Sequence, residues 1–186
     1  FRVWRQLGNA SPPLVHYVAP TVWAWRPERA QNFADAIQHL LVLLPFEPPY
    51  FEKVGLPCTF VGHPVLESGA DKGDGAAFRA QHDISDDALV LGVLPGSRRG
   101  EVGRLLRPFG DTVRRLAVMH PGLRVIVPTV PTVAGLVRAA VADWPVETLV
   151  VPDLSQKYHA MAACDAALAA SGTVALELGM AGIPMV

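Results

Sequence analysis

The chain has 186 residues, enough for one domain of ordinary size or for parts of two. Hydrophobic residues make up 51% of the sequence and charged residues 18%, a composition that supports a packed core and excludes intrinsic disorder. The 16 Lys and Arg nearly balance the 17 Asp and Glu, which excludes a bulk nucleic-acid binder with its basic excess.

Short apolar runs alternate with longer segments of helical spacing, the pattern of an α/β protein. The apolar runs are rich in Val and Leu and predict strands at residues 14–18, 40–44, 58–61, 89–94, 123–127, 148–151 and 166–169. Helical spacing predicts helices at residues 23–39, 76–81, 101–119, 132–141, 155–163 and 173–181. Residues 183–186 resemble the entry into a further strand, and Phe1 is not an initiator methionine, so we expect a fragment at both ends.

A polar, glycine-rich interval divides the chain. We interpret residues 65–75 as a hinge between two Rossmann-like domains, one ending at residue 64 and one covering residues 76–186. Two such domains predict a ligand cleft between them.

The first candidate site follows the predicted strand 89–94. Gly96, Ser97 and Arg98 form a turn before a helix, which places backbone N–H groups, a hydroxyl and a guanidinium at the carboxyl end of the strand. Such a turn predicts an anion site. The alternative is a plain strand-to-helix turn with a solvated Arg98–Arg99 pair.

The second candidate site follows the predicted strand 166–169. Ser171, Gly172 and Thr173 open a helix, and Glu177 lies one turn into it. A carboxylate without a partner there could accept hydrogen bonds from the two hydroxyls of a ribose. The alternative is a helix cap in which the helix dipole favours Glu177.

Taken together, the two turns predict a clamp for a diphosphate, because parallel neighbouring strands bring both helix N-termini to one edge. The sequence contains no Asp-x-Asp cation motif, so we expect no metal and assign charge neutralisation to Arg98 and the helix ends. Cys58 and Cys164 are far apart and the histidines lack metal-binding spacing, which fits a reducing, cytosolic setting.

The first half of the chain carries an aromatic and basic segment after the strand 14–18. In a helix that begins near Trp23, the side chains of Trp25, Arg26 and Arg29 would share one face while Trp23 turns toward the core. That face would suit an amphiphile with an acyl chain and a phosphate.

In their order, these motifs resemble the lipid-A-disaccharide synthases, glycosyltransferases of bacterial lipid A assembly. The resemblance spans essentially the whole chain and is carried by residues 17–26, 44–47, 60–64, 94–102 and 170–177. Residues 95–98 or 171–173 alone would be weak signals, whereas the ordered set with residues 23–26 is specific.

The resemblance implies a GT-B fold, with residues 1–64 in the acceptor domain and residues 76–186 in the nucleotide-sugar domain. It implies transfer of 2,3-diacylglucosamine from UDP-2,3-diacylglucosamine to 2,3-diacylglucosamine 1-phosphate with release of UDP, inversion at the anomeric carbon, and no metal or cofactor. It also implies a cytoplasmic enzyme, and it allows peripheral contact with the inner membrane of a Gram-negative bacterium and a homodimer.

Residue by residue, the resemblance assigns Ser97 and Arg98 to the diphosphate loop and Glu177 to the ribose. It assigns Ser171, Gly172 and Thr173 to a second phosphate turn. Trp25, Arg26 and Arg29 fall on the acceptor or lipid side. The general base of the family is an aspartate a few residues before the position of Phe1, so we expect no turnover from these residues alone.

Two other functions compete with this interpretation. One is another UDP-sugar enzyme of GT-B type, such as the peptidoglycan N-acetylglucosaminyltransferase or a UDP-sugar epimerase, against which residues 23–26 argue. The other is a nucleotide-binding module without catalysis.

Overall fold

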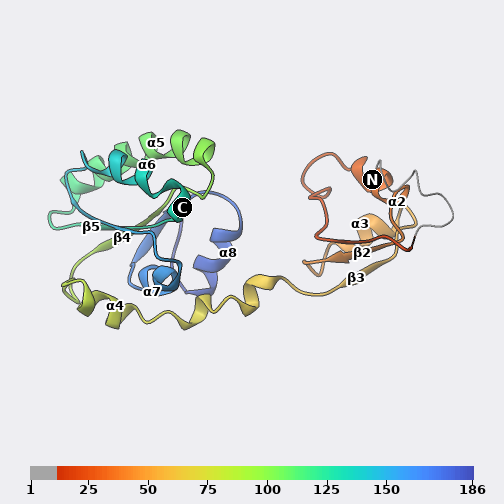
Figure 1. Cartoon of the computed structure of the whole chain (residues 1–186), viewed down its shortest axis with the longest axis horizontal. Coiled ribbons are helices and arrows are strands. Elements are labelled where there is room, and N and C mark those ends of the chain that lie inside the picture. Colours follow the sequence, from red (N-terminus) through yellow and green to blue (C-terminus); the bar gives the residue numbers. More distant parts are fainter. Residues whose placement is uncertain (1–11) are drawn as a thin grey trace. The chain divides into compact units, whose positions relative to one another are not determined.

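The computed structural model describes residues 12–186 (Figure 1). The chain divides into two compact units, Phe1–Pro64 and Val65–Val186, each with its own parallel sheet. Over the described residues, no helix has both the length and the apolar character needed to cross a membrane.

The first unit contains a sheet of three parallel strands in the order β1-β2-β3. Its strands are β1 (Val15–Tyr17), β2 (His39–Val42) and β3 (Cys58–Phe60), and its helices are α2 (Arg29–Ala34) and α3 (Pro48–Glu52). All three strands lie where the apolar runs predict them. Buried apolar side chains of the loops, helices and β2 form the core, among them Val22, Ile37, Leu40, Val42, Phe51 and Leu56.

The helix predicted at residues 23–39 is wrong over most of its length. Only α2 is helical there, and residues 21–25 instead form a turn in which the N–H of Trp25 donates to the carbonyl of Thr21 at 3.1 Å. Arg26 has a φ of 55° and precedes Pro27. A residue before proline is pushed out of the helical region, so the helix begins only after this pair.

The second unit is a doubly wound sheet of four parallel strands in the order β6-β5-β4-β7. The strands are β4 (Val90–Leu94), β5 (Arg124–Pro128), β6 (Glu147–Val151) and β7 (Ala166–Ala169). Helices α5 (Arg99–Met119) and α6 (Pro131–Val141) cover one face, and α4 (Gly75–Gln81) and α7 (Lys157–Ala162) cover the other (Figure 1). Val93, Val125 and Val127 pack toward one face, and Val90 and Ile126 pack toward the other, which explains the continuous apolar runs of β4 and β5.

The order of the strands reverses at β4. The chain passes from β4 to β5 and β6 on one side, then returns to place β7 on the other side of β4. In open α/β sheets, ligands bind outside the carboxyl ends of the strands at such a switch point. Beyond β7, residues 184–186 pair with it in parallel through a bridge between Met185 and Ala167, as expected for the entry into a further strand.

The glycine-rich segment interpreted as a hinge packs against α7. It contains two 3-10 helices, η2 (Pro64–Glu67) and η3 (Ala70–Lys72), and Ala70 is fully buried. A Cβ atom on Gly73 would collide with the carbonyl of Tyr158. The N–H of Asp74 donates to Nδ1 of His159 at 2.9 Å. The glycine therefore serves a close approach of two backbones within the second unit.

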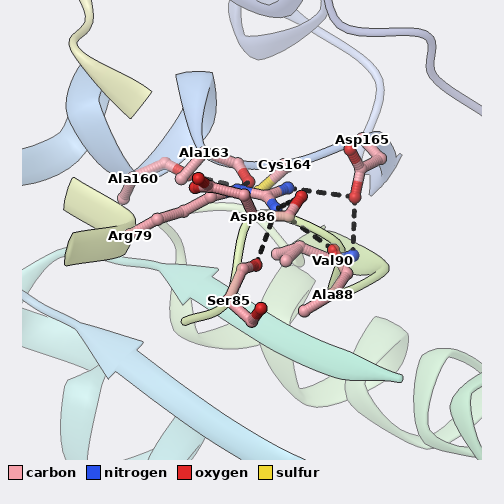
Figure 2. Close-up of polar contacts among 9 residues, drawn as sticks. All are labelled: Arg79, Ser85, Asp86, Ala88, Val90, Ala160, Ala163, Cys164 and Asp165. Carbon is pink, nitrogen blue, oxygen red and sulfur yellow. Dashed lines mark hydrogen bonds and ion pairs between the residues drawn. The ribbon is translucent and has the colours of Figure 1, made fainter. Parts of the chain in front are cut away.

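Arg79 of α4 hydrogen-bonds to residues 85–88 and to residues 163–165, which precede strands β4 and β7 (Figure 2). Its side chain is only 11% exposed. The guanidinium donates to four backbone carbonyls, those of Ser85, Asp86, Ala88 and Ala163, and forms an ion pair with Asp165.

Both cysteines of the chain are free. Burial raises the pKa of Cys164 to about 12 and that of Cys58 to about 11. Both side chains are therefore protonated thiols at neutral pH, and each donates to a backbone carbonyl, that of Ala160 and that of Leu56 respectively.

Candidate functional site

A cavity of about 360 Å³ lies in the second unit, at the carboxyl ends of its strands and next to the switch point. Its volume is within the range of small-molecule sites. The cavity brings together all six residues that the sequence assigns to the nucleotide: Ser97, Arg98, Ser171, Gly172, Thr173 and Glu177. The prediction that both turns meet at one edge is confirmed, because β4 and β7 are parallel neighbours.

The first turn connects β4 to α5 and presents Ser97 and Arg98 to solvent. Gly96 has a φ of 101°, a left-handed conformation that favours glycine, and a Cβ atom there would collide with the carboxylate of Glu101. Arg98 is the N-cap of α5, and its carbonyl accepts the N–H of Val102 at 2.9 Å. Its guanidinium forms no ion pair with any residue of 12–186, so its charge is available to a ligand.

The second turn connects β7 to α8 (Thr173–Met180). Gly172, with a φ of 137°, is the N-cap, and no side chain caps the helix. The expectation that the hydroxyls of this turn cap the helix is therefore wrong. The first N–H groups of α8 keep their capacity to bind an anion.

Glu177 differs from the expected carboxylate without a partner. It is only 8% exposed, and the ammonium of Lys157 lies 2.7 Å from its Oε1 and 2.6 Å from its Oε2. The hydroxyl of Tyr158 donates to Oε1 at 3.0 Å. Lys157 and Tyr158 begin α7, about 20 residues before Glu177 in the chain, and neither was predicted as a site residue from the sequence.

The segment before α7 is held by Asp153. Oδ1 of Asp153 accepts the hydroxyl and the N–H of Ser155, each at 2.8 Å, and these two bonds lower the pKa of Asp153. These two bonds cap the start of the 3-10 helix η4 (Leu154–Gln156). This short helix leads into α7, and Leu154 and Lys157 line the cavity.

The end of β5 supplies a wall of the cavity that was also not predicted from the sequence. Residues 128–130 follow the predicted strand 123–127, so the rule that ligands bind at the carboxyl ends of strands could have identified them. The hydroxyl of Thr129 is the one buried side-chain oxygen or nitrogen of residues 12–186 that has no hydrogen-bond partner.

The charges around the cavity are balanced. Arg98 and Lys157 are opposed by Glu101 and Glu177. Across the described part of the chain, no three His, Cys, Asp or Glu side chains gather as ligands for a metal ion.

The aromatic and basic segment at residues 23–29 lies on the surface of the first unit. Trp25 is 63% exposed, and the guanidinium carbon of Arg26 lies 4.3 Å from the centre of its ring. Arg29 is exposed at the start of α2, and because residues 23–26 are not helical, the helical face predicted to carry Trp25, Arg26 and Arg29 does not form. The expectation that Trp23 is buried is wrong, because it is 41% exposed and packs edge-on against Phe46, with ring centres 5.3 Å apart.

Two solved structures resemble the fold. UDP-GlcNAc 2-epimerase from Neisseria meningitidis bound to UDP-GlcNAc matches with a TM-score of 0.64 and 17% identity, over 94% of this chain and 52% of that one. A glycosyl transferase of family 9 from Veillonella parvula DSM 2008 matches with a TM-score of 0.51 and 13% identity, over 88% of this chain and 61% of that one. At such identities the likeness concerns the fold alone, and it confirms the predicted GT-B class.

Sequence comparison is more specific. A protein named lipid-A-disaccharide synthase from Rhodospirillum centenum is 62% identical over 188 residues, covering 100% of this chain and 47% of the relative. A second protein of that name, from Paramagnetospirillum magneticum, is 55% identical over 94% of this chain and 44% of the relative. The chain thus spans about half the length of these relatives. Residues 2–186 match the family described as Lipid-A-disaccharide synthetase, and the chain belongs to that family.

Proposed function

We propose that this protein transfers 2,3-diacylglucosamine from UDP-2,3-diacylglucosamine to 2,3-diacylglucosamine 1-phosphate, forming a β-1,6-linked disaccharide 1-phosphate and releasing UDP. The observation that carries the proposal is the cavity that unites two glycine turns, Arg98 and Glu177 at the switch point of the second unit, in a chain of this family. The reaction takes place at the cytoplasmic face of the inner membrane.

The two turns hold the diphosphate of the donor. N–H groups at the start of α5 and α8 and the guanidinium of Arg98 face negative charge that grows on the leaving UDP as the glycosidic bond breaks. A charge-assisted hydrogen bond contributes about 1.5 to 3 kcal/mol, so Arg98 and a few amides can stabilise the leaving group.

Glu177 binds the ribose. Its Oε1 accepts two hydrogen bonds within the protein, from Lys157 and Tyr158, whereas Oε2 accepts one. A carboxylate oxygen has two lone pairs, so Oε2 retains an acceptor position for a ligand hydroxyl. The Glu177 carboxylate is buried and already held in place, so a binding ribose does not lose affinity to the entropy cost of ordering this side chain.

In the transfer step, the 6-hydroxyl oxygen of the acceptor attacks the anomeric carbon of the donor from the face opposite the diphosphate. The bond from the anomeric carbon to the phosphate oxygen breaks, and UDP leaves with the electron pair, so the configuration inverts. The hydroxyl proton passes to a general base, which we assign to an aspartate upstream of Phe1.

The exposed side chains of Trp25, Arg26 and Arg29 serve the lipid side of the reaction. An aromatic ring with a guanidinium stacked on it presents both an apolar surface and a positive charge. That combination suits the acyl chains and the 1-phosphate of the acceptor, and the anionic headgroups of a membrane.

The test is product formation by the protein expressed from its complete reading frame. With radiolabelled donor and unlabelled acceptor, we expect a labelled disaccharide 1-phosphate and an equal amount of UDP, both strongly reduced by Arg98→Ala. Binding of UDP without any disaccharide would favour a nucleotide-binding module. Conversion of the donor without use of the acceptor would favour a UDP-sugar epimerase or hydrolase.

A further inference from the structure

We propose that Lys157 is a positioning residue of the nucleotide site, which fixes the carboxylate of Glu177 and cancels its charge so that the cavity accepts a diphosphate. This inference rests on the proposed function, because it concerns how the same cavity binds UDP. Neither the sequence motifs nor the relatives' names assign a role to Lys157.

The first support is the geometry of the pair. The ammonium of Lys157 contacts both carboxylate oxygens of Glu177, at 2.7 and 2.6 Å, and Tyr158 adds a third bond at 3.0 Å. The side chains of Lys157 and Glu177 are 27% and 10% exposed. Three hydrogen bonds from two donor groups leave this buried carboxylate little rotational freedom, so the orientation of Glu177 is set before a ligand arrives.

The second support is the location of the pair. Both residues line the cavity that contains Arg98 and the two turns assigned to the diphosphate. A bound diphosphate would therefore share this small space with the carboxylate of Glu177, and like charges repel each other more strongly when one of them, as here Glu177, is shielded from water.

The third support is the balance of charges in the cavity wall. With Lys157 present, Arg98 and Lys157 match Glu101 and Glu177. Without Lys157, Arg98 alone would face two carboxylates, and the wall would be net negative toward an anionic ligand. Lys157 thus allows one cavity to use a carboxylate for a ribose and still bind phosphate.

The experiment compares two ligands that differ in charge. Calorimetry on the full-length protein measures the affinity for UDP, which carries the diphosphate, and for uridine, which carries only the ribose and the base. If Lys157→Met leaves an unbalanced Glu177, we expect the affinity for UDP to fall about tenfold or more and that for uridine to fall less. Lys157→Arg keeps the charge and should keep most of the UDP affinity.

The double variant Lys157→Met/Glu177→Gln separates the proposal from direct contact between Lys157 and a phosphate. Both variants are also measured with uridine, which reports the loss of the ribose contact of Glu177. Removing the carboxylate together with the lysine should restore much of the ratio of UDP affinity to uridine affinity that Lys157→Met loses. If Lys157 instead bound phosphate itself, the ratio of UDP affinity to uridine affinity in the double variant would stay as low as in Lys157→Met, and the proposal would be overturned.

A purely structural role also has its own signature. It would lower the affinities for UDP and uridine by the same factor, or change only the melting temperature, and either result contradicts the proposal. If Lys157→Met does not fold, Glu177→Gln is the substitute, because a cavity with an unopposed Lys157 should bind UDP better relative to uridine than the wild type does. An unchanged ratio would overturn the proposal.

The failure of this inference differs from the failure of the proposed function. Wild-type protein that binds no UDP contradicts the proposed function itself. Wild-type protein that binds UDP, with a Lys157→Met variant that binds it equally well, contradicts only the role of Lys157.

Discussion

Arg79 and Asp165 form an ion pair in which Nη2 lies 3.1 Å from Oδ2, and the same Oδ2 accepts the N–H of Val90 at 2.7 Å (Figure 2). One carboxylate therefore joins α4 to the beginnings of the neighbouring strands β4 and β7. Both strands end in the turns that form the candidate site, so this contact helps to set their register.

Arg79→Ala should lower the free energy of unfolding of the second unit by about 3 kcal/mol, because it leaves several backbone carbonyls without a donor in a poorly exposed place. Urea unfolding followed by circular dichroism measures the loss. Arg114→Ala is the matched control, since Arg114 and Asp111 form an exposed pair and its loss should cost about 0.5 kcal/mol or less. Equal losses of unfolding free energy for the two variants would show that the hydrogen bonds of Arg79 contribute no more to stability than an exposed ion pair.

Arg98→Ala should reduce kcat/KM of the full-length protein by roughly 10- to 100-fold, because the guanidinium would meet charge that grows in the transition state. Arg99→Ala is the control, because Arg99 is exposed at the start of α5 and does not line the cavity. Steady-state kinetics on both variants measure the effect. A larger loss for Arg99→Ala than for Arg98→Ala would mean that the anion site is misplaced.

Trp23→Ala should cost about 0.5 to 1.5 kcal/mol of unfolding free energy, the value of its edge contact with Phe46, and not the 3 to 5 kcal/mol typical of a buried aromatic residue. Trp25→Ala should leave stability almost unchanged and weaken binding to vesicles that contain anionic lipid. Urea unfolding and vesicle sedimentation measure the two effects. A Trp25→Ala protein that sediments with vesicles as the wild type does would remove the lipid-side role of this ring.

Thr129→Val should raise the free energy of unfolding by about 1 kcal/mol, because valine has the same shape and removes a buried hydroxyl without a partner. The backbone bond from the N–H of Thr129 to Val151 is kept. Thr148→Val is the control, since the hydroxyl of Thr148 donates to the carbonyl of Val146 and its removal should bring no gain. Thermal melting measures the stability of both variants. A lower melting temperature for Thr129→Val than for the wild type would contradict the conclusion that the Thr129 hydroxyl has no hydrogen-bond partner.

The sequence predicted the strands well for a physical reason. Strands β4, β5 and β7 are short runs dominated by Val, Leu, Ile or Ala, as strands covered on both faces require. Strands β1 (Val15–Tyr17) and β3 (Cys58–Phe60) are less apolar and more exposed, and they were predicted from the short apolar runs that contain them. The two turns could also be predicted, because Gly96 and Gly172 adopt backbone conformations that side chains disfavour. The parallel order of strands then brings the turns together.

Two predictions failed because the periodicity of apolar residues carries no information about a local helix-breaking pair or about contacts between distant segments. The helix at residues 23–39 was interrupted by the Arg26–Pro27 pair, a local signal that the helical spacing outweighed in the prediction. The partners of Glu177 could not be predicted, because only the packing of α7 against α8 brings Lys157 and Tyr158 to it.

The most direct measurement of the central claim, that the cavity of the second unit binds the nucleotide of the donor, is a crystal structure of the protein with UDP. We expect the diphosphate between residues 96–98 and residues 171–173, with the guanidinium of Arg98 within hydrogen-bond distance of a phosphate oxygen and a ribose hydroxyl on Glu177. UDP bound elsewhere on the protein, with this cavity empty, would contradict the claim.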